Sequence, residues 1–380
     1  MPIFLTTLSV WISTHIMHYL NIDQIKAFHI EHTSKCNLFC PQCARTLDGG
    51  LNPELELDEL TLDDYKKVFT PDFAKKVERI WFCGNYGDPI ASNTFLECAE
   101  YLKSVGVQTL QIHTNGSARN SDWWKRLAEV PVEATFSIDG LEDTNPMYRV
   151  NSNFKKIVNN IESYIGAGGK AHWDYLIFDH NIHQVGVAKK LAKDLGFKTM
   201  SFKNTSRFVT TDGFKEHIDN TTANVKTRKK EYTLSSKQNT NKNKFEQIID
   251  QYGSFDNYVN TTSISCKTKN KAQLYIDFQF KVWPCCWLGG PTHFFGKKNV
   301  QKNQLRSLQE RYGNDFNDLR KYSLEQVLNH IWYSNHLSDS WKNTMEDSNP
   351  KLFTCGRTCG TDYEFSSVGN FNEQRFRLNG

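Results

Sequence analysis

The sequence has few cysteines for its length, little net charge and no long apolar run. Ten cysteines in 380 residues lie well below the density of about 8–10% that marks small disulfide-bonded scaffolds. A net charge of +4, from 46 basic and 42 acidic residues, is too small to indicate nucleic acid or a membrane as partner. With 38% hydrophobic and 23% charged residues, we expect a globular protein rather than a multi-span membrane protein or a disordered chain.

The N-terminal segment also lacks the features of a secretory signal. Residues 3–20 are fairly apolar, but Ser, Thr and His interrupt them and no Lys or Arg precedes them. A signal peptide needs a basic n-region and a small-residue cleavage site. We therefore interpret residues 1–24 as a leader that packs on the main domain, with a weak membrane anchor as the less favoured alternative. The expected location is cytoplasmic, without stable membrane association.

Strand-like and helix-like segments alternate between residues 25 and 208. This alternation is typical of a parallel sheet with helical crossovers. Six β–α units are present, two fewer than in a closed eight-fold barrel. The expected strands are residues 25–31, 78–83, 107–113, 133–138, 170–178 and 197–203.

Two of the connecting helices have clear boundaries in the sequence. Thr61 is expected to cap a helix, with Asp64 three residues later completing a capping box. A second helix carries apolar residues at helical spacing from Phe154 to Ile165 and stops at Gly-Ala-Gly-Gly, residues 166–169. These helices support the crossover pattern.

Beyond residue 210 the chain changes character. Residues 221–244 hold seven Lys or Arg but one acid, Glu231, among Thr, Asn and Ser, which predicts a flexible linker or a surface insertion. Residues 274–282 alternate like a hairpin and run into Pro-Cys-Cys at 284–286. Residues 323–337 are expected to form one amphipathic helix. Its inward side chains would be Leu324, Val327, Leu328 and Ile331.

The cysteines are clustered, which favours metal or redox chemistry in a reducing compartment. Cys36, Cys40 and Cys43 follow the first predicted strand directly. Soft thiolates select iron–sulfur or zinc sites. Three thiolates can bind three irons of a [4Fe–4S] cluster and leave the fourth iron open to a reactant. A zinc site is the competing interpretation.

The spacing C-x3-C-x2-C after the first strand, followed by further β–α units, resembles the radical S-adenosylmethionine (SAM) superfamily over residues 25–210. The resemblance implies a partial (β/α)6 TIM barrel of radical SAM type. It also implies a [4Fe–4S] cluster that binds SAM, and reductive cleavage of SAM to a 5′-deoxyadenosyl radical that abstracts hydrogen from substrate. An electron donor such as flavodoxin or ferredoxin would be the partner.

Other segments resemble motifs of that family at the ends of predicted strands, where barrel sites are built. Residues 84–89 resemble the Gly-Gly-Glu-Pro segment that holds the SAM amino group, with Asp88 in place of the commoner Glu. Arg149 stands where peptide-modifying relatives pair an arginine with the SAM carboxylate. Gly116 and Gly140 also suit tight turns, and Arg149 also suits an exposed helix start. The resemblance implies SAM contacts at Gly84, Gly87, Asp88, Thr114, Asn115, Ser137, Asp139 and Arg149.

Five further cysteines lie beyond the predicted barrel. A lone cysteine, a hairpin ending in Pro-Cys, a helix and a close cysteine pair are similar to the shortened SPASM form called a twitch domain. Four thiols suffice for a second, auxiliary [4Fe–4S] cluster, and zinc is the alternative there. The expected ligands are Cys266, Cys285, Cys355 and Cys359, with Cys286 as the reserve. We expect Cys83 and Cys98 to be core thiols.

These features divide the chain into four expected parts: residues 1–24 as leader, 25–210 as partial barrel, 211–262 as linker or basic insertion, and 263–380 as a twitch/SPASM-like auxiliary cluster domain. The leading hypothesis is a radical SAM oxidoreductase acting on a peptide or protein side chain, or second, on a small polar metabolite. An RNA-modifying enzyme that uses the basic insertion is the alternative. A non-catalytic iron–sulfur scaffold is disfavoured because it would not need the SAM-contact residues.

Overall fold

The computed structural model describes residues 19–204, 210–212, 215–217, 222–226, 231–235, 242–293, 300–362 and 374–378. At its centre lies a sheet in the order β14-β13-β1-β4-β5-β6-β7-β8-β15. The six predicted strands are all present and pair in parallel. Their bounds are Ala27–Ile30 (β1), Arg79–Phe82 (β4), Thr109–Thr114 (β5), Val132–Ser137 (β6), Ala171–Ile177 (β7) and Thr199–Asn204 (β8).

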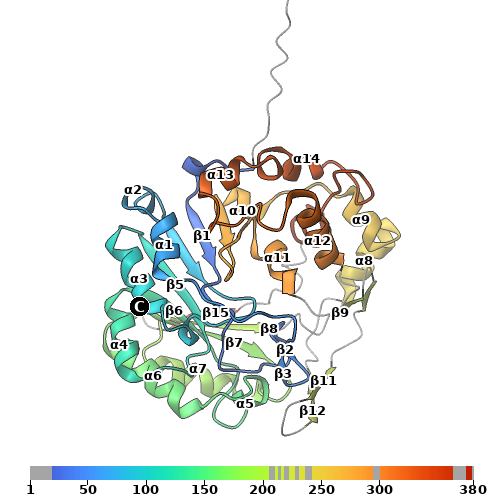
Figure 1. Ribbon diagram of the computed structural model, residues 1–380. Helices are drawn as coiled ribbons and strands as arrows, with labels where there is room; N and C mark the ends of the chain where they lie inside the picture. The colour runs from blue at the N-terminus through green and yellow to red at the C-terminus, as the bar shows by residue number, and fades with distance from the viewer. Residues whose placement is uncertain are drawn as a thin grey trace, which may run out of the picture.

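Helices connect these strands and cover one side of the sheet (Figure 1). The predicted capping box is present: the Thr61 side chain accepts from the Asp64 amide, and the Asp64 side chain accepts from the Thr61 amide. The second predicted helix spans Phe154–Gly166 and buries Ile157 and Ile161. The connecting helices are Leu62–Val68 (α1), Pro71–Ala74 (α2), Phe95–Ser104 (α3), Ser121–Glu129 (α4), Asn145–Tyr148 (α5), Phe154–Gly166 (α6) and Val185–Asp194 (α7).

The C-terminal hairpin joins the same sheet. Strand β13 (Gln273–Ile276) pairs in parallel with β1, and β14 (Val282–Trp283) pairs antiparallel with β13. Strand β15 (Gln374–Arg377) pairs antiparallel with β8 at the opposite edge. The hairpin predicted from the alternation at 274–282 is therefore confirmed, and its backbone is continuous with the sheet. The four-part division of the chain stays a prediction.

The basic insertion contains an antiparallel hairpin of β11 (Thr222–Lys226) and β12 (Glu231–Ser235). Leu234 of this hairpin is fully buried against Tyr148 and Phe178. The Tyr232 hydroxyl donates to the Met147 carbonyl. The insertion thus packs on the α5 end of the parallel sheet through apolar contacts.

The single helix predicted over residues 323–337 is wrong. Helix α13 (Leu324–Asn329) ends at His330, whose φ of −59° and ψ of 141° are not helical. A π-helical turn, Trp332–His336, and α14 (Leu337–Ser340) follow. The break leaves Ile331 45% exposed, whereas Leu324, Val327 and Leu328 are buried. Trp332 and Tyr333 pack inward instead. Burying these large rings stabilises the fold more than a continuous helix with one apolar face would.

The remaining helices cluster around the C-terminal hairpin (Figure 1). Across the described ranges no helix combines the length and apolarity that a membrane span requires. The bounds of these C-terminal helices are Lys242–Tyr252 (α8), Phe255–Thr261 (α9), Lys267–Asn270 (α10), Cys286–Gly289 (α11), Val300–Tyr312 (α12) and Phe353–Cys359 (α15).

The core between sheet and helices is aromatic, and Phe136 on β6 lies at its centre. Its ring centroid is 5.3 Å from that of Trp124 and 5.9 Å from that of Phe197. Because Phe136 is fully buried, we expect Phe136→Ala to lower the free energy of unfolding by about 3–5 kcal/mol. Urea unfolding measures this. Val187→Ala, at a 58% exposed position, is the control and should change it by less than about 0.5 kcal/mol. Equal small effects would contradict the packing described.

Candidate functional site

The three clustered cysteines lie on the loop after β1, and the first of them, Cys36, stands six residues after Ile30, where β1 ends. The Cys43 amide donates to the Cys40 carbonyl over 3.0 Å, which folds the loop into a turn. Buried Arg45 donates to the Leu38 carbonyl over 3.1 Å. Burial, followed by the charges of Asp88 and the neighbouring thiols, raises the pKa of Cys36. The structure therefore brings the three thiols together in one shielded loop.

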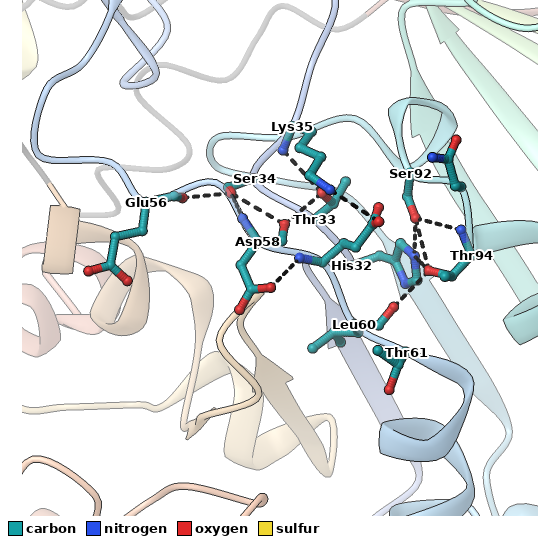
Figure 2. Close-up of polar contacts among 12 residues, drawn as sticks. His32, Thr33, Ser34, Lys35, Glu56, Asp58, Leu60, Thr61, Ser92 and Thr94 are labelled. Carbon is teal, nitrogen blue, oxygen red and sulfur yellow. Dashed lines mark hydrogen bonds and ion pairs between the residues drawn. The ribbon is translucent and has the colours of Figure 1, made fainter.

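A polar network fixes the chain segment that leads into this loop (Figure 2). The Ser34 hydroxyl donates to the Glu56 carbonyl over 2.8 Å and accepts from the Asp58 amide over 2.9 Å. The buried His32 ring has Ser92 Oγ at 2.7 Å from Nε2 and Tyr65 Oη at 2.9 Å from Nδ1. These contacts hold the backbone of residues 31–35 in one conformation, which fixes the position from which Cys36 extends.

Asp88 and Asn115 connect two strand ends to the thiol loop. The Asn115 backbone amide and its side-chain Nδ2 both donate to Asp88 Oδ2 over 2.7 Å. The same Nδ2 lies 3.7 Å from Cys36 Sγ. Burial raises the pKa of Asp88 to about 6 despite these donors. The shorter acid in place of Glu is thus engaged by the protein, where it aligns the end of β5 with the thiol loop.

Arg149 is not an exposed helix-start charge. Its Nε donates to Asp139 Oδ2 over 2.6 Å, and its Nη1 lies 3.9 Å from Cys40 Sγ. The Asp139 side chain is fully buried, and its other oxygen accepts from the Leu176 amide over 2.7 Å. Burial raises the pKa of Asp139, and the Arg149 guanidinium opposes that rise. Asp139 therefore orients a half-buried cation beside the thiol loop.

The expected glycines stand where a side chain has no room. A Cβ at Gly87 would lie 1.7 Å from the Thr33 carbonyl oxygen, and one at Gly84 would lie 2.4 Å from the Gly87 carbonyl oxygen. Gly116 and Gly140 have positive φ values of 70° and 139°, so they are turn glycines. The close approach of residues 84–87 to residue 33 places this turn directly against the strand that feeds the thiol loop.

The other two expected residues end their strands. Thr114 is the last residue of β5, and its hydroxyl accepts from the Gly116 amide over 3.1 Å. Ser137 is the half-buried last residue of β6. Both strand ends lie at the edge of the sheet where β1 leads into the thiol loop, because all these strands run in parallel. All eight expected SAM contacts therefore gather at one end of the sheet.

Sequence reasoning missed Glu31, which directly follows β1. Its Oε1 accepts from the Tyr86 amide over 2.7 Å and from the Gly87 amide over 3.3 Å. Its Oε2 accepts from the Tyr275 hydroxyl, which comes from β13. The side chain is buried, and burial raises its pKa to about 7. The available signal was a carboxylate at the end of an otherwise buried predicted strand.

The second set of thiols meets around a small cavity of about 20 Å³. The cavity is enclosed and otherwise lined by Leu288, Leu337, Trp341 and neighbouring residues. Tyr19, from the end of the predicted leader, closes one side with its hydroxyl 3.8 Å from Cys266 Sγ; residues 1–18 lie outside the described residues. The lining cysteines are Cys266, Cys285, Cys355 and Cys359.

Two cysteines face a different cavity, which is described below. Cys286, the first residue of α11, and Cys83, directly after β4, both line it. Cys83 is half-buried, so it is not the packed core thiol that we expected, whereas Cys98 is fully buried in the core. Strand geometry explains the difference, because Cys83 follows buried Phe82 and points to the opposite face of the sheet. Adjacent Cys285 and Cys286 thus belong to different environments.

The donor chemistry suits iron–sulfur clusters. All ten cysteines are free thiols, and a [4Fe–4S] cluster binds each thiolate through a different iron. In the part of the chain that the structure describes, no three His, Cys, Asp or Glu side chains converge on the position of one metal ion. Three thiols around a loop and four around an enclosed cavity are consistent with two separate multi-iron groups.

Comparison with known proteins gives one family match. Residues 30–186 match the model of the radical SAM superfamily. A curated relative, the tungsten-containing aldehyde ferredoxin oxidoreductase cofactor-modifying protein of Pyrococcus furiosus, is 31% identical over 122 residues, which are 31% of this chain and 32% of that protein. The match thus spans about a third of the relative's length. The matched family region contains the thiol loop and every residue expected to contact SAM.

Solved structures show a more distant similarity. Streptococcus suis SuiB bound to S-adenosylmethionine has a TM-score of 0.48 and 13% identity, covering 75% of this chain and 65% of that one. The enzyme anSMEcpe with bound AdoMet has a TM-score of 0.48 and 16% identity, covering 90% of this chain and 94% of that one.

The buried carboxyl of Glu31 makes stability depend on pH. Its folded pKa of about 7 lies above the usual 4.5, so the folded state binds the proton more tightly than the unfolded state. The stabilisation that proton binding to Glu31 gives the folded state is fully present below about pH 4.5. It is lost as the pH rises to about 7. Glu31→Gln stays neutral and keeps an acceptor for the two amides. We expect the wild type to lose up to roughly 3 kcal/mol relative to this variant across that range.

Urea unfolding at several pH values between 4.5 and 7.5 measures the difference. Glu162→Gln, at an exposed position on α6, is the matched control and should follow the wild-type profile. Parallel profiles for the wild type and Glu31→Gln would show that the burial of Glu31 has no such effect.

Proposed function

We propose that this chain is an iron–sulfur oxidoreductase of the radical SAM type, which uses SAM to abstract hydrogen from an organic substrate, because residues 30–186 match the model of that superfamily. The observation that carries the proposal is the gathering of three thiols, the Asp88–Asn115 pair and the Asp139–Arg149 pair at one end of the sheet. When bound, the cluster and SAM together supply the electron and the 5′-deoxyadenosyl radical.

The residues of this chain have separable tasks in the proposal. Cys36, Cys40 and Cys43 hold the cluster, and Arg149 offers its guanidinium to the SAM carboxylate. Asp139 keeps that guanidinium beside Cys40, since it fixes Nε and leaves the other nitrogens to face the thiol loop. A fixed guanidinium loses little conformational entropy on binding a carboxylate. The Gly84–Asp88 turn supplies backbone oxygens for the SAM amino group.

The hairpin of β11 and β12 is proposed to exclude water from this end of the sheet. Leu234 is fully buried on Tyr148, which directly precedes Arg149. Burial, followed by the charge that Cys40 carries when it is deprotonated, raises the pKa of Tyr232 to about 12. A reactive radical needs such exclusion of solvent. The structure does not favour the RNA-modifying alternative, because Tyr232, the one aromatic residue between positions 221 and 244, donates to the Met147 carbonyl of the main domain.

The four thiols around the small cavity are proposed to hold a second [4Fe–4S] cluster. Leu288, Leu337 and Trp341 line the cavity together with the four thiols, and an apolar shell of this kind keeps solvent from a cluster. When bound, such a cluster would supply an acceptor for the electron left on the substrate after hydrogen abstraction. The substrate classes proposed are a peptide or protein side chain and a small polar metabolite, with flavodoxin or ferredoxin as electron donor.

The first test is SAM cleavage. Anaerobically reconstituted and reduced wild-type protein should release 5′-deoxyadenosine from SAM. Single replacement of Cys36, Cys40 or Cys43 by Ala should abolish that release, because each removes one of three cluster ligands. Cys98→Ala, which removes a buried core thiol on α3, is the control and should release 5′-deoxyadenosine like the wild type. Chromatography of the products measures the effect, and wild-type protein that releases none would refute the proposal.

The second test counts iron and exploits the adjacent cysteines. Two [4Fe–4S] clusters correspond to about eight irons per chain. Cys285→Ala should lower this number to about four, whereas Cys286→Ala should keep about eight, because only Cys285 lines the four-thiol cavity. Colorimetric iron analysis and the visible absorption of the clusters give the result. About four irons in the wild type would refute the second cluster. Iron loss in Cys286→Ala but not in Cys285→Ala would show that Cys286, rather than Cys285, is the ligand.

A further inference from the structure

A cavity of about 830 Å³ lies beside strands β1, β4 and β5, and helices α10 and α11 contribute to its wall. Its volume falls within the range of about 300–1,000 Å³ that is typical of small-molecule sites. At one end it reaches Gln42 of the thiol loop and the turn of Gly84 and Asn85. The cavity therefore connects the proposed SAM site with the outer surface.

Cationic side chains mark the opposite end of this cavity. Arg79 is the first residue of β4, and Lys271 lies two residues before β13, so both stand where these parallel strands begin. Both are exposed, as is Trp287 of α11. Half-buried Lys267 lines the same region. These residues form what we call the cationic mouth: Arg79, Lys267 and Lys271.

The interior of the cavity is polar but carries no charge at neutral pH. Burial lowers the pKa of His29 to about 4 and that of His113 to about 4. The Trp81 ring lies between them, with centroids 4.4 Å from His29 and 5.2 Å from His113. Aromatic and neutral polar walls suit the uncharged body of an organic molecule. Charge is concentrated at the mouth.

Among the described residues that line the cavity there is no carboxylate that could balance Arg79 and Lys271. Glu78, the chain neighbour of Arg79, pairs with Lys26 at 3.6 Å. Glu133 pairs with Lys170 at 3.1 Å and accepts from Gln111 over 3.2 Å. These two acids are therefore engaged by other cations, and a cleft lined by one sign of charge attracts ligands of the opposite sign.

We propose that the substrate is a small molecule with a carboxylate or phosphate group, which Arg79 and Lys271 bind at the cationic mouth while its uncharged part extends toward the thiol loop. An arginine fork and a lysine ammonium both pair well with such anions. That the bound anion is the substrate rests on the proposed function. The anion site itself rests on the cavity and its charges alone.

The test titrates the reconstituted full-length protein with inorganic pyrophosphate, with citrate and with uncharged glycerol, following heat release and the fluorescence of the lining tryptophans. Wild type should bind at least one of the anions saturably, and glycerol should not bind. The double variant Arg79→Glu, Lys271→Glu should bind that anion at least about tenfold more weakly. Lys156→Glu, Lys193→Glu makes the same change in net charge at exposed positions on α6 and α7 and should stay within about twofold of wild type.

Neutral and conservative variants protect the test against misfolding. Arg79→Gln, Lys271→Gln should also weaken anion binding, and Arg79→Lys, Lys271→Arg should restore most of it, with circular dichroism confirming the fold of each. Preference for pyrophosphate or for citrate would identify the anion as phosphate or carboxylate, and either supports the proposal. Absence of saturable anion binding, or equal loss in the mouth variant and the control, would overturn it.

The same wild-type preparation is assayed for 5′-deoxyadenosine release from SAM. Release without anion binding would refute the cationic mouth and leave the proposed function standing. Anion binding without release would refute the proposed function and leave the anion site standing. The two proposals therefore fail separately.

Discussion

The buried carboxylate of Glu31 is the contact on which the arrangement of the molecule depends. It accepts from the Tyr86 and Gly87 amides and from the Tyr275 hydroxyl, so one side chain ties the end of β1 to the turn after β4 and to the C-terminal hairpin. A buried carboxylate costs several kcal/mol unless such donors surround it. Because three donors from two distant segments must all be in place, the thiol loop, the adjacent turn and the hairpin have one mutual arrangement.

Parallel strands place every loop of the proposed SAM site at the same edge of the sheet, and buried polar pairs then set their positions. Asp88 binds Asn115 from the next strand, and Asp139 binds Arg149 from the following helix end. The Asp88–Asn115 pair joins two consecutive β–α units, whereas the Asp139–Arg149 pair lies within the connection from β6 to α6. Each pair includes a group near a thiol. In a low-dielectric setting such hydrogen bonds are strong and costly to break. They hold the loop in shape before any cofactor binds.

The fold also explains how one chain keeps the four-thiol cavity apart from the larger cavity that leads to the thiol loop. Cys285 precedes α11 as its N-cap residue and Cys286 begins the helix, so neighbouring side chains turn in different directions. One faces the enclosed four-thiol cavity and the other faces the larger cavity with the cationic mouth. The parallel pairing of β13 with β1 places the C-terminal hairpin directly against the sheet. Proximity of the two sites is thus a result of backbone pairing.

The sequence by itself determined the features that depend on local spacing. These are the six β–α units, the capping box at Thr61 and the loop of three cysteines, because hydrophobic periodicity and ligand spacing act over a few residues. Only the tertiary structure decided which distant groups meet. It separated Cys285 from Cys286, moved Cys83 out of the core, broke the helix at His330 and gave Glu31 its three donors. The physical reason is that burial and hydrogen bonding join residues that are distant in the sequence, such as Glu31 and Tyr275, which are 244 positions apart. No local pattern encodes such pairings.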